Sequence, residues 1–318
     1  LNKIKNISNP IIICNVEHRF IVAEQMREIK IEPKAIILEP EGKNTTPAVT
    51  LAAIKSLEFS KDPTLLILPA DHSIQDNDSF KSSIEKGKFF AENSQIVTFG
   101  ILPTKPETGF GYIEAEDYLD FKNTSGSKIK RFIEKPNLKE AKNLIQDKKY
   151  SWNSGIFLVK SKTILKEVKK FEPDIYSLCF ESLNPKNYDL SFQRLKEDTF
   201  KKCKNISLDN AIMEKTDLGY VIPLDAKWND VGSWNSLWEI SEKDFNGNTK
   251  TGNIYTKKAK NCYINSESRL IVGLDIEDLI IVDTDDALLV ARRNSSQEVK
   301  NIVSQLLEKN LTEAKQQK

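Results

Sequence analysis

Two aspartates lie where a metal ion could be bound. Asp71 follows the apolar run 65–68 and the pair Pro69-Ala70, and Asp230 lies two residues before Gly232. Magnesium in phosphoryl-transfer sites is held by one or two carboxylates, while water and phosphate oxygens complete its shell. Taken singly, Asp71 fits a turn or helix cap equally well, and an aspartate before a glycine is more often structural. The two together form the candidate magnesium site.

A second group of residues could recognise a sugar phosphate. Glu134 and Lys135 end an expected strand, where the carboxylate could accept from a sugar diol and the ammonium could meet a phosphate. A surface ion pair between these neighbours is the commoner explanation. Gly109 could let a backbone amide approach a ligand, and Asn153 could bond a sugar hydroxyl. A plain turn accounts for either residue equally well.

The segment Asn44-Thr45-Thr46-Pro47 precedes an expected helix. Thr46 is the expected N-cap, with Pro47 at the first helical position. A helix N-terminus of this kind also suits a nucleobase edge or an anion. His72 directly follows Asp71, and neighbours in sequence are not expected to face each other as a catalytic dyad. No covalent intermediate is therefore indicated.

The composition argues against several classes of function. The 318 residues are 39% hydrophobic and 29% charged, which is ordinary for a soluble globular protein, and the net charge of +1 favours neither nucleic acid nor an anionic membrane. With four widely spaced cysteines and two histidines, neither disulfides nor a Cys/His zinc site is expected. No apolar run approaches the roughly 20 residues of a membrane span. Without a secretory signal, the expected compartment is the cytoplasm.

The candidate residues are positioned by an alternation of apolar runs and helical patterns. Short β-branched runs at 11–13, 35–38, 65–68 and 96–99 are typical of parallel strands buried on both faces. The helical patterns between them cover 17–30, 47–59 and 79–93. This alternation predicts a doubly wound α/β sheet, in which ligands bind beyond the carboxyl ends of the strands.

The pattern changes near residue 104. Antiparallel-looking pieces follow at 111–114, 129–134 and 155–159, and helical stretches at 138–147, 161–170 and 207–216. Ser207 is the expected N-cap of the last stretch. We expect this part to be an insertion that covers the active edge of the sheet, which makes the sheet mixed.

The C-terminal part is rich in short strands. They are expected at 261–264, 269–272, 278–282 and 287–291. Their spacing predicts a small stacked, β-helix-like region. An amphipathic helix over 296–313, packed on a neighbour, would close it. The predicted domains are 1–245 and 246–318.

Five motifs occur together and in one order. They are Leu68-Pro-Ala-Asp-His72, Pro106-Glu-Thr-Gly-Phe-Gly-Tyr-Ile113, Phe132-Ile-Glu-Lys-Pro136, Trp152-Asn-Ser-Gly-Ile-Phe157 and the segment 228–234. With them the chain resembles the bacterial mannose-1-phosphate guanylyltransferases, a family of nucleotide-sugar pyrophosphorylases, over nearly its whole length. The fold that this resemblance implies is a Rossmann-like nucleotidyltransferase.

The resemblance implies formation of GDP-mannose and pyrophosphate from GTP and α-D-mannose 1-phosphate, with Mg²⁺ as cofactor. It implies a catalytic set of Asp71, Lys135 and Asp230. The implied metal ligands are Asp71 and Asp230. The sugar phosphate would be bound by Gly109, Glu134, Lys135 and Asn153. A third group, next to guanine, would be Asn44, Thr45 and Pro47. In uridylyl and thymidylyl relatives a Gln-x-x-Pro-x-Gly-Leu-Ala segment fills the place of the third group, and its absence here favours a purine.

The family's Gly-rich triphosphate loop, of the type Gly-Gly-x-Gly-Thr-Arg-Leu, does not occur in these 318 residues, nor does the isomerase domain that some members carry. The expectation is therefore a fragment with little activity. Two alternatives stay open: a pyrophosphorylase for another nucleotide and sugar, and a non-catalytic, pyrophosphorylase-like binding subunit. A homo-oligomer formed through the C-terminal strands and helix also stays open.

Overall fold

The structure, a computed structural model, describes residues 4, 6–122, 125–184, 187–189, 191–311 and 313 of the chain. The chain divides into two compact units. Unit 1 comprises Leu1–Ala70 and Ile74–Trp228, and unit 2 comprises Asp71–Ser73 and Asn229–Lys318. The short segment Asp71–Ser73 therefore belongs with the C-terminal part of the chain and not with its neighbours in sequence.

The first sheet of unit 1 has the strand order β1-β2-β10-β9. Its strands are β1 (Ile11–Asn15), β2 (Ala35–Glu39), β10 (Phe192–Arg194) and β9 (Asn187–Asp189), of which only β9 runs antiparallel to its neighbour. The helices of this part are η1 (Val16–His18), α1 (Arg19–Glu28) and α2 (Thr45–Ser56). Ile36 and Leu38 pack with Ala23 of α1, whereas Ile37 packs with Val49 of α2, so β2 is buried on both faces as its composition predicts.

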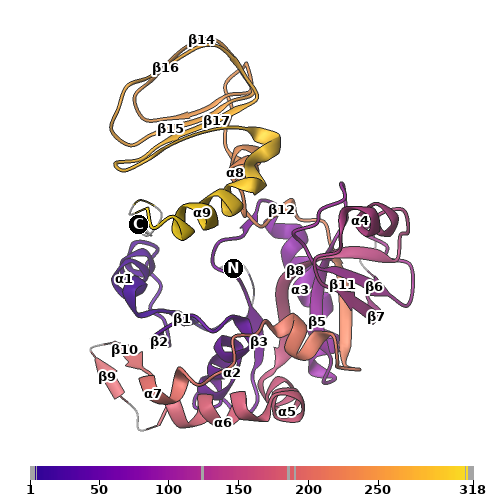
Figure 1. The fold of residues 1–318 in the computed structure, drawn as a ribbon. Helices are drawn as coiled ribbons and strands as arrows, with labels where there is room; N and C mark the ends of the chain where they lie inside the picture. The colour runs from indigo at the N-terminus through magenta and orange to yellow at the C-terminus, as the bar shows by residue number, and fades with distance from the viewer. Residues whose placement is uncertain are drawn as a thin grey trace. The chain divides into compact units, whose positions relative to one another are not determined.

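The second sheet of unit 1 has the order β3-β8-β5-β11-β7-β6 (Figure 1). Its strands are β3 (Thr64–Ile67), β8 (Tyr150–Lys160), β5 (Ile96–Ile101), β11 (Gly219–Leu224), β7 (Ser127–Ile133) and β6 (Tyr112–Ala115). Helix α3 (Asn77–Glu92) covers one face through Phe80 and Ile84. Helices α5 (Ser161–Phe171) and η2 (Asp209–Met213) supply Ile164 and Ile212 to the other face. Helices on both faces confirm the doubly wound α/β fold. Further helices of this unit are α4 (Leu138–Leu144), α6 (Pro173–Ser182) and α7 (Glu197–Phe200).

The strand runs predicted in the N-terminal half all form, but they do not share one parallel sheet. Strand β3 pairs antiparallel with β8, which also pairs antiparallel with β5, whereas β1 and β2 lie in the other sheet. A buried apolar run has the same composition in either pairing direction, so the runs could not reveal it. The expectation that the pieces after residue 104 cover the sheet was wrong, because β6, β7 and β8 are strands of the sheet itself.

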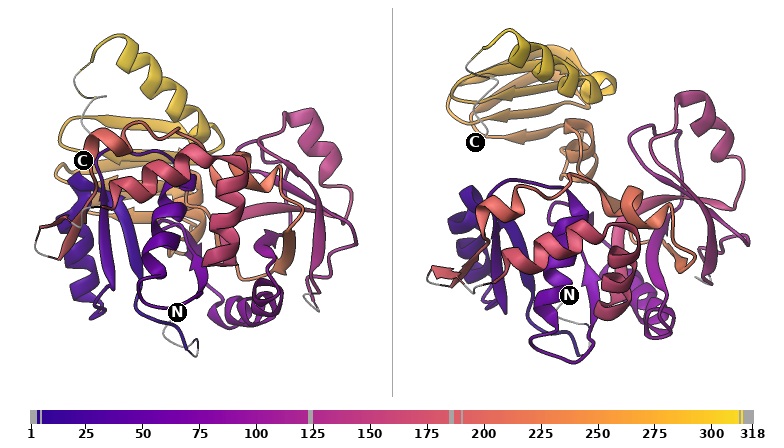
Figure 2. Two further views of the ribbon diagram at one scale, coloured as in Figure 1. Left: turned by 90° about the horizontal axis from the view of Figure 1, so that it is seen from below. Right: turned by 60° about the horizontal axis from the view of Figure 1, so that its bottom comes forward.

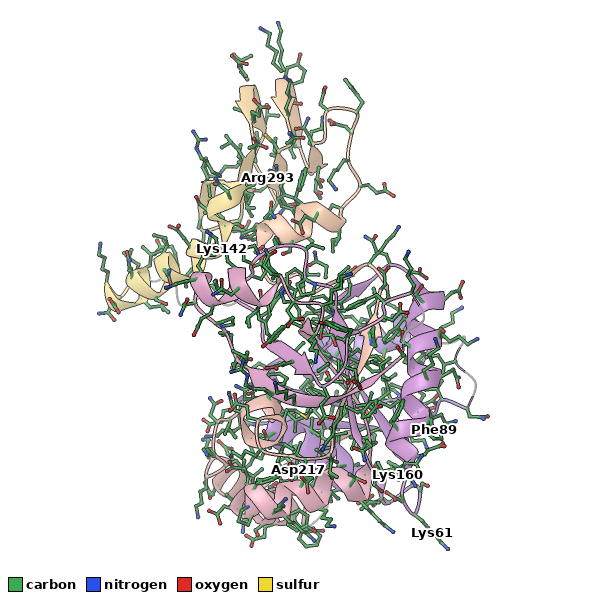
Figure 3. The ribbon with its side chains drawn as sticks, turned by 90° about the vertical axis from the view of Figure 1, so that its right-hand side faces the viewer. Lys61, Phe89, Lys142, Lys160, Asp217 and Arg293 are labelled. Atoms are coloured by element: carbon green, nitrogen blue, oxygen red, sulfur yellow. The ribbon has the colours of Figure 1, made fainter. Side chains whose placement is uncertain are left out.

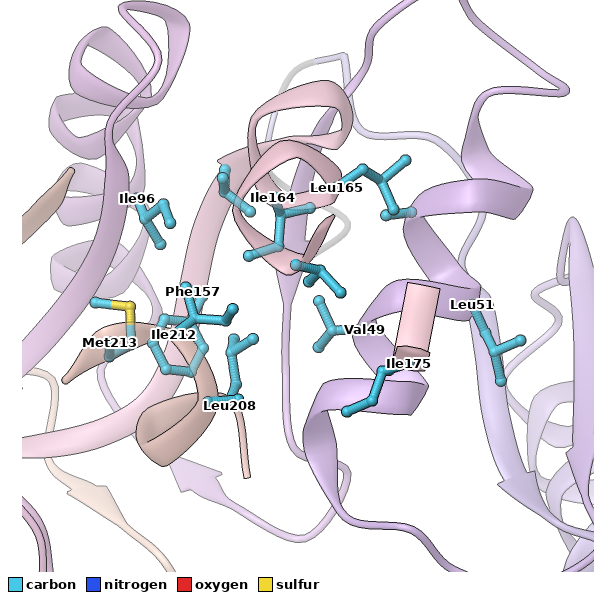
Figure 4. Packing of buried hydrophobic residues seen from close by; sticks show 14 of the residues in the cluster. Val49, Leu51, Ile96, Phe157, Ile164, Leu165, Ile175, Leu208, Ile212 and Met213 are labelled. Atoms are coloured by element: carbon cyan, nitrogen blue, oxygen red, sulfur yellow. The ribbon is translucent and has the colours of Figure 1, made fainter. Parts of the chain in front are cut away.

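Segment η2 is a π-helical turn fixed by the core. The Glu214 backbone N–H donates to the Asp209 carbonyl five residues back at 3.0 Å, and the Ser207 hydroxyl accepts from the Asn210 backbone N–H at 3.2 Å. The N-cap position of η2 is Leu208, so the expectation of Ser207 as N-cap was wrong by one residue, although the Ser207 hydroxyl bonds into the turn. Figure 4 shows Leu208, Ile212 and Met213 around Phe157 of β8, and all four side chains are buried. The apolar side of the turn is thereby anchored against the sheet.

Unit 2 is a stack of short strands (Figure 2). Its elements are α8 (Trp234–Ile240), β13 (Thr249–Thr251), β14 (Ile254–Lys260), β15 (Tyr263–Ser266), β16 (Ile271–Glu277), β17 (Leu279–Asp283), β18 (Leu288–Arg292), η3 (Arg293–Glu298) and α9 (Val299–Glu308). Strands β14 and β16 pair in parallel, as do β15 and β17, at a spacing of 17 residues (254 to 271, 263 to 280). The regular spacing confirms the β-helix-like region.

The amphipathic helix predicted for the C-terminal end forms as α9. Ile302, Val303 and Leu307 are exposed on it, and none of its described residues is buried. The predicted packing on a neighbour is therefore not seen within the part of the chain that the structure describes. None of the helices in this described part has both the length and the apolar composition needed to cross a bilayer.

Candidate functional site

Three polar side chains of unit 1 form what we call the acid–amide cluster: Glu134, Asn153 and Asp209. The Asn153 side-chain N–H donates to Asp209 Oδ1 at 2.9 Å, and its Oδ1 accepts from the Thr98 hydroxyl, also at 2.9 Å. The amide is thus held between β5 and η2. Asn153 lies inside β8 and not in a turn, so the turn interpretation of this residue was wrong.

The Asp209 carboxyl is the most perturbed member of the cluster. Burial raises its pKa from 3.8 to about 6, the negative charge of Glu134 adds to the rise, and the bond from Asn153 opposes it. At neutral pH the group is therefore ionised, although it titrates close to that range. A half-buried carboxylate beside a second one suits a ligand that donates several hydrogen bonds.

Glu134 and Lys135 are joined, as the simpler interpretation of the sequence expected. Lys135 Nζ lies 2.8 Å from Glu134 Oε1, and Lys135 itself has a φ of 46°. A non-glycine residue in this left-handed region is uncommon and is often found at functional sites. The sequence predicts both an ion pair and a ligand contact here. The two are compatible, because a sugar phosphate could replace Glu134 as the partner of the exposed Lys135 ammonium.

Gly111, in the neighbouring loop, leaves space that the Glu134 side chain occupies. A Cβ atom there would lie 2.8 Å from Glu134 Oε2, whereas a Cβ on Gly109 would meet no heavy atom within 4 Å. The Gly111 carbonyl also accepts from the Asn153 backbone N–H at 2.8 Å. The structure thus connects Gly111 to the acid–amide cluster. The open space beside Gly109 neither supports nor opposes its predicted backbone contact with the ligand, which stays a prediction.

The loop that enters α2 is organised differently from its predicted form. Asn44, with a φ of 67°, is the N-cap, and its side chain accepts from the Thr45 backbone N–H at 2.9 Å. The helix begins at Thr45, so the expectation of Thr46 as cap and Pro47 as first residue was wrong. The reason is that the Asn44 amide oxygen reaches the first helical N–H, and Thr46 is left fully buried.

This loop is bonded to the segment that carries Asp209. The Thr45 hydroxyl accepts from the Leu208 backbone N–H at 2.7 Å, and the Thr46 backbone N–H donates to the Ile206 carbonyl at 3.2 Å. The predicted guanine loop and the acid–amide cluster are therefore parts of one hydrogen-bonded assembly, although Thr45 and Leu208 lie 163 residues apart in sequence.

Buried polar atoms at the end of β2 were not predicted from the sequence. Glu39 is only 9% exposed, and burial raises the pKa of its carboxyl to about 7. Glu39 Oε1 and both side-chain polar atoms of Gln193 have no hydrogen-bond partner among the described residues. Because β10 pairs with β2 and Gln193 stands opposite Ile37, both side chains point to the face of β2 that packs on α2. A glutamate ending an otherwise apolar strand was the available signal.

The two candidate metal ligands lie in unit 2, in what we call the aspartate–histidine group: Asp71, His72 and Asp230. The Asp71 side chain is 82% exposed, and its Oδ1 lies 4.0 Å from His72 Nε2, longer than a hydrogen bond. Burial lowers the pKa of His72, while the charges of Asp71 and Asp230 both oppose that shift. Both carboxylates therefore lie close enough to act on one imidazole. Asp230 also covers Gly232, where a Cβ would lie 2.5 Å from its Oδ2.

The chemistry of these donors fits magnesium only in part. Carboxylate oxygens are the ligands that Mg²⁺ prefers, and one or two of them suffice when substrate phosphates complete the shell. Among the described residues no three His, Cys, Asp or Glu side chains converge on a metal position. The pair suits an ion that arrives with a phosphate better than a resident ion in a closed protein site.

The comparisons with known proteins agree with these features. The family model for nucleotidyl transferase matches residues 1–247. The chain belongs to the nucleotidyl transferase family. A second model, for the MannoseP isomerase/GMP-like beta-helix domain, matches residues 253–306 of this nucleotidyl transferase and agrees with the strand stack of unit 2.

Relatives of this nucleotidyl transferase include two mannose-1-phosphate guanylyltransferases. The protein of Salmonella montevideo is 46% identical over 304 residues, which cover 95% of this chain and 64% of that protein. The protein of Escherichia coli (strain K12) is 43% identical over 94% of this chain and 63% of that protein. The chain thus spans less than two thirds of the length of these relatives.

One solved structure extends the likeness to the fold. The crystal structure of mannose-1-phosphate geranyltransferase from Thermus thermophilus has a TM-score of 0.78 and 25% identity, and the match covers 93% of this chain and 83% of that one. The resemblance inferred from the five motifs is therefore confirmed, as is the α/β nucleotidyltransferase fold with its β-helix-like C-terminal region.

Proposed function

We propose that this chain binds α-D-mannose 1-phosphate and GTP and belongs to an enzyme that joins them into GDP-mannose with release of pyrophosphate. A phosphate oxygen of the sugar phosphate would form a bond to the α-phosphorus of GTP, and the bond from that phosphorus to the bridging oxygen of pyrophosphate would break. The reaction needs no covalent enzyme intermediate, so positioning and charge neutralisation would supply most of the rate.

The observation that carries the proposal is the bonded assembly of the acid–amide cluster with the Asn44–Pro47 loop. Glu134 would accept from sugar hydroxyls, and the exposed Lys135 ammonium would turn from Glu134 to the sugar phosphate. Asn153 already uses its amide on Thr98 and Asp209, so its contribution to sugar binding would be mainly to hold Asp209 in place. Gly109 would offer its backbone.

The position and burial of Glu39 favour guanine as the base of the nucleotide. Guanine presents two N–H donors on adjacent atoms of its pairing edge, and a carboxylate can accept both, whereas adenine presents an acceptor at the matching ring nitrogen. Glu39 is buried at the start of the loop that contains Asn44, Thr45 and Pro47, and it has an oxygen without a partner among the described residues. Ionised Glu39 is costly in the free protein, since burial raises its pKa to about 7, and two donors from a base would offset that cost.

Asp71 and Asp230 are the residues that would hold Mg²⁺. The ion would neutralise negative charge on the phosphates. His72 is kept neutral by burial at physiological pH, and it would not compete as a cation for the two carboxylates.

Calorimetric titration of the 318-residue chain tests the proposal. With Mg²⁺ present we expect binding of α-mannose 1-phosphate, and binding of GTP in preference to ATP, UTP and dTTP. Pyrophosphorolysis of GDP-mannose, followed with protein in excess over substrate, would then show whether the chain turns over. Binding without any turnover supports the binding-subunit alternative. The proposal fails if neither the sugar phosphate nor GDP-mannose binds.

A further inference from the structure

We propose that Asp209 is a sugar-binding residue and that Thr45, in the predicted guanine loop, positions it. This inference rests on the proposed function and goes beyond it, because neither the motifs nor the resemblance assigns a role to Asp209 or a role in sugar binding to Thr45. The ligand would be a hexose 1-phosphate whose neighbouring hydroxyls donate to two carboxylates, those of Glu134 and Asp209.

The first reason is that Asp209 is fixed from three directions. Its Oδ1 accepts from Asn153 at 2.9 Å, and the backbone beside it is held by the bond from the Leu208 N–H to the Thr45 hydroxyl at 2.7 Å. The Ser207 hydroxyl also accepts from the Asn210 backbone N–H at 3.2 Å. The buried side chains of Leu208 and Ile212 fix the other side of the turn. A carboxylate that only stabilised a helix N-terminus would need none of these constraints, because such an effect is available to any acidic residue in the first turn.

The second reason is that the Asp209 carboxylate is linked through Asn153 to Glu134, a predicted sugar-binding residue. Asn153 connects Asp209 to the loop around Gly111, since its backbone N–H donates to the Gly111 carbonyl at 2.8 Å. The same Gly111 leaves room for Glu134 Oε2, which a Cβ would meet at 2.8 Å. Glu134 and Asp209 are thus connected through one glycine and one amide. Lys135 pairs with Glu134 and Asn153 donates to Asp209, but a carboxylate accepts several hydrogen bonds, so sugar hydroxyls are suitable further donors to both.

The third reason is that the bond from Thr45 links the two substrates. Thr45 uses its hydroxyl on the Leu208 N–H, so the loop predicted to contact guanine also sets the position of the residue next to Asp209. A nucleotide that orders this loop would order the sugar-binding residue with it. We therefore expect each substrate to bind more tightly when the other is present.

The charges around Asp209 make sugar binding depend on pH. Glu134 and, on its own turn, Glu214 raise the pKa of Asp209, the Asn153 bond lowers it, and Lys135 partly neutralises Glu134. The pKa is about 6 in the free protein, so affinity for the sugar phosphate should fall as the pH drops below that value. Binding should lower the pKa, because donors stabilise the ionised form.

The test compares Asp209→Asn with wild type and with the control Asp217→Asn, titrated separately with α-mannose 1-phosphate and GTP. Asp217, labelled in Figure 3, is exposed and lies outside the cluster. We expect Asp209→Asn to weaken sugar-phosphate binding roughly ten- to a hundredfold, as for loss of a charged hydrogen bond, with GTP binding unchanged. Deoxy analogues of the sugar sharpen the result: one deletion should be costly in wild type and nearly neutral in Asp209→Asn. Equal sugar affinity in wild type and variant overturns the assignment, whereas no binding by wild type overturns the proposed function instead.

A second pair of variants covers the case in which Asp209→Asn does not fold. Thr45→Val removes the hydroxyl that accepts from Leu208 and keeps the shape, and Thr45→Ser keeps the hydroxyl. We expect Thr45→Val to weaken sugar-phosphate binding several-fold and Thr45→Ser to retain it. If Thr45→Val weakens only GTP binding, Thr45 is a base contact and not a positioning residue, and the link between the two substrates is wrong.

Discussion

The acid–amide cluster and the aspartate–histidine group are both built on carboxylates, yet the protein treats them in opposite ways. In the cluster, Asp209 is half-buried and accepts a hydrogen bond from Asn153 before any ligand arrives. In the group, the Asp71 side chain is 82% exposed, and its Oδ1 lies 4.0 Å from His72 Nε2. The side chains of the cluster are already held by hydrogen bonds within the protein, whereas the Asp71 carboxylate of the group is open to solvent.

The difference follows from what each site would have to bind. A sugar is neutral apart from its phosphate, so selectivity depends on hydrogen-bond acceptors that are fixed in advance. Removing these acceptors from water costs free energy, which lowers the stability of the protein. A metal ion brings two charges and its own water shell, so exposed carboxylates can move onto it. The two sites should therefore respond differently to substitution: the cluster in stability and affinity together, the group in activity alone.

The largest effect is expected from Asp71→Asn and Asp230→Asn. Either change removes a carboxylate charge while keeping the side chain's size, and we expect turnover to fall by roughly a hundred- to a thousandfold. Mg²⁺-dependent pyrophosphorolysis of GDP-mannose in single turnover measures this loss. The melting temperature of Asp71→Asn should stay at the wild-type value, since most of this side chain is exposed to solvent. A large drop in melting temperature would place these residues in a structural role and erase the contrast.

The next effect is on stability and comes from Ile212→Ala. Ile212 is fully buried on the apolar side of η2, and its truncation leaves a cavity next to Phe157 (Figure 4). We expect a loss of about 3 kcal/mol in the free energy of unfolding, together with weaker sugar-phosphate binding, because the turn carries Asp209. Urea denaturation measures the first and calorimetry the second. The control is Ile29→Ala, whose side chain is exposed and whose loss should cost less than about 0.5 kcal/mol. Unchanged sugar binding in Ile212→Ala would show that the turn does not position Asp209.

The sequence predicted only part of the acid–amide cluster. Glu134 ends a predicted strand and Asn153 lies in one of the five motifs, so both were expected to bind the sugar. Asp209 was missed because an acidic residue in the first turn of a helix needs no explanation beyond the helix dipole. Its partner Asn153 lies 56 residues away, and only the fold brings the two together. The strands themselves were predictable from β-branched runs, and the antiparallel pieces after residue 104 were expected. The antiparallel pairing of β3 with β8 was not, since it depends on a partner distant in sequence.

The aspartate–histidine group shows the converse limit. Asp71 and Asp230 were paired through family resemblance, and the structure adds that both act on His72. Adjacency of Asp71 and His72 in sequence gave no reason to expect that a third residue, far along the chain, would affect the same ring. Local sequence patterns identify candidate residues such as Asp71. Which charges act on a given side chain depends on how the whole chain folds.

The pH dependence of stability provides a third test. The pKa of Asp209 is raised in the folded state, from 3.8 to about 6, so the folded protein binds more protons between these values. Stability from this group is therefore greatest at low pH and is lost as the pH rises from about 4 to about 6, by up to about 3 kcal/mol. Glu39, with a pKa of about 7, adds a slope of the same sign that extends to higher pH. The free energy of unfolding, measured by urea denaturation, should change less with pH in Asp209→Asn below about pH 6. Its change between about pH 6 and 7 should remain. An unchanged profile would mean that the carboxyl is solvated.

The smallest effect is expected from Thr98→Val, which is also the most direct test of how rigid the cluster is. The fully buried Thr98 hydroxyl lies 2.9 Å from Asn153 Oδ1 and 3.1 Å from the Ile156 carbonyl, and valine replaces it without changing the volume. The amide oxygen of Asn153 would then be buried with one bond fewer, at a cost of about 1–2 kcal/mol in unfolding free energy. Thr98→Ser, which keeps the hydroxyl, is the matched control for the polar bond. If sugar-phosphate affinity falls with stability in Thr98→Val but not in Thr98→Ser, the amide must be held from both ends to align Asp209. If affinity survives, the single bond from Asn153 to Asp209 is sufficient, and the cluster depends less on its support from β5 than its geometry implies.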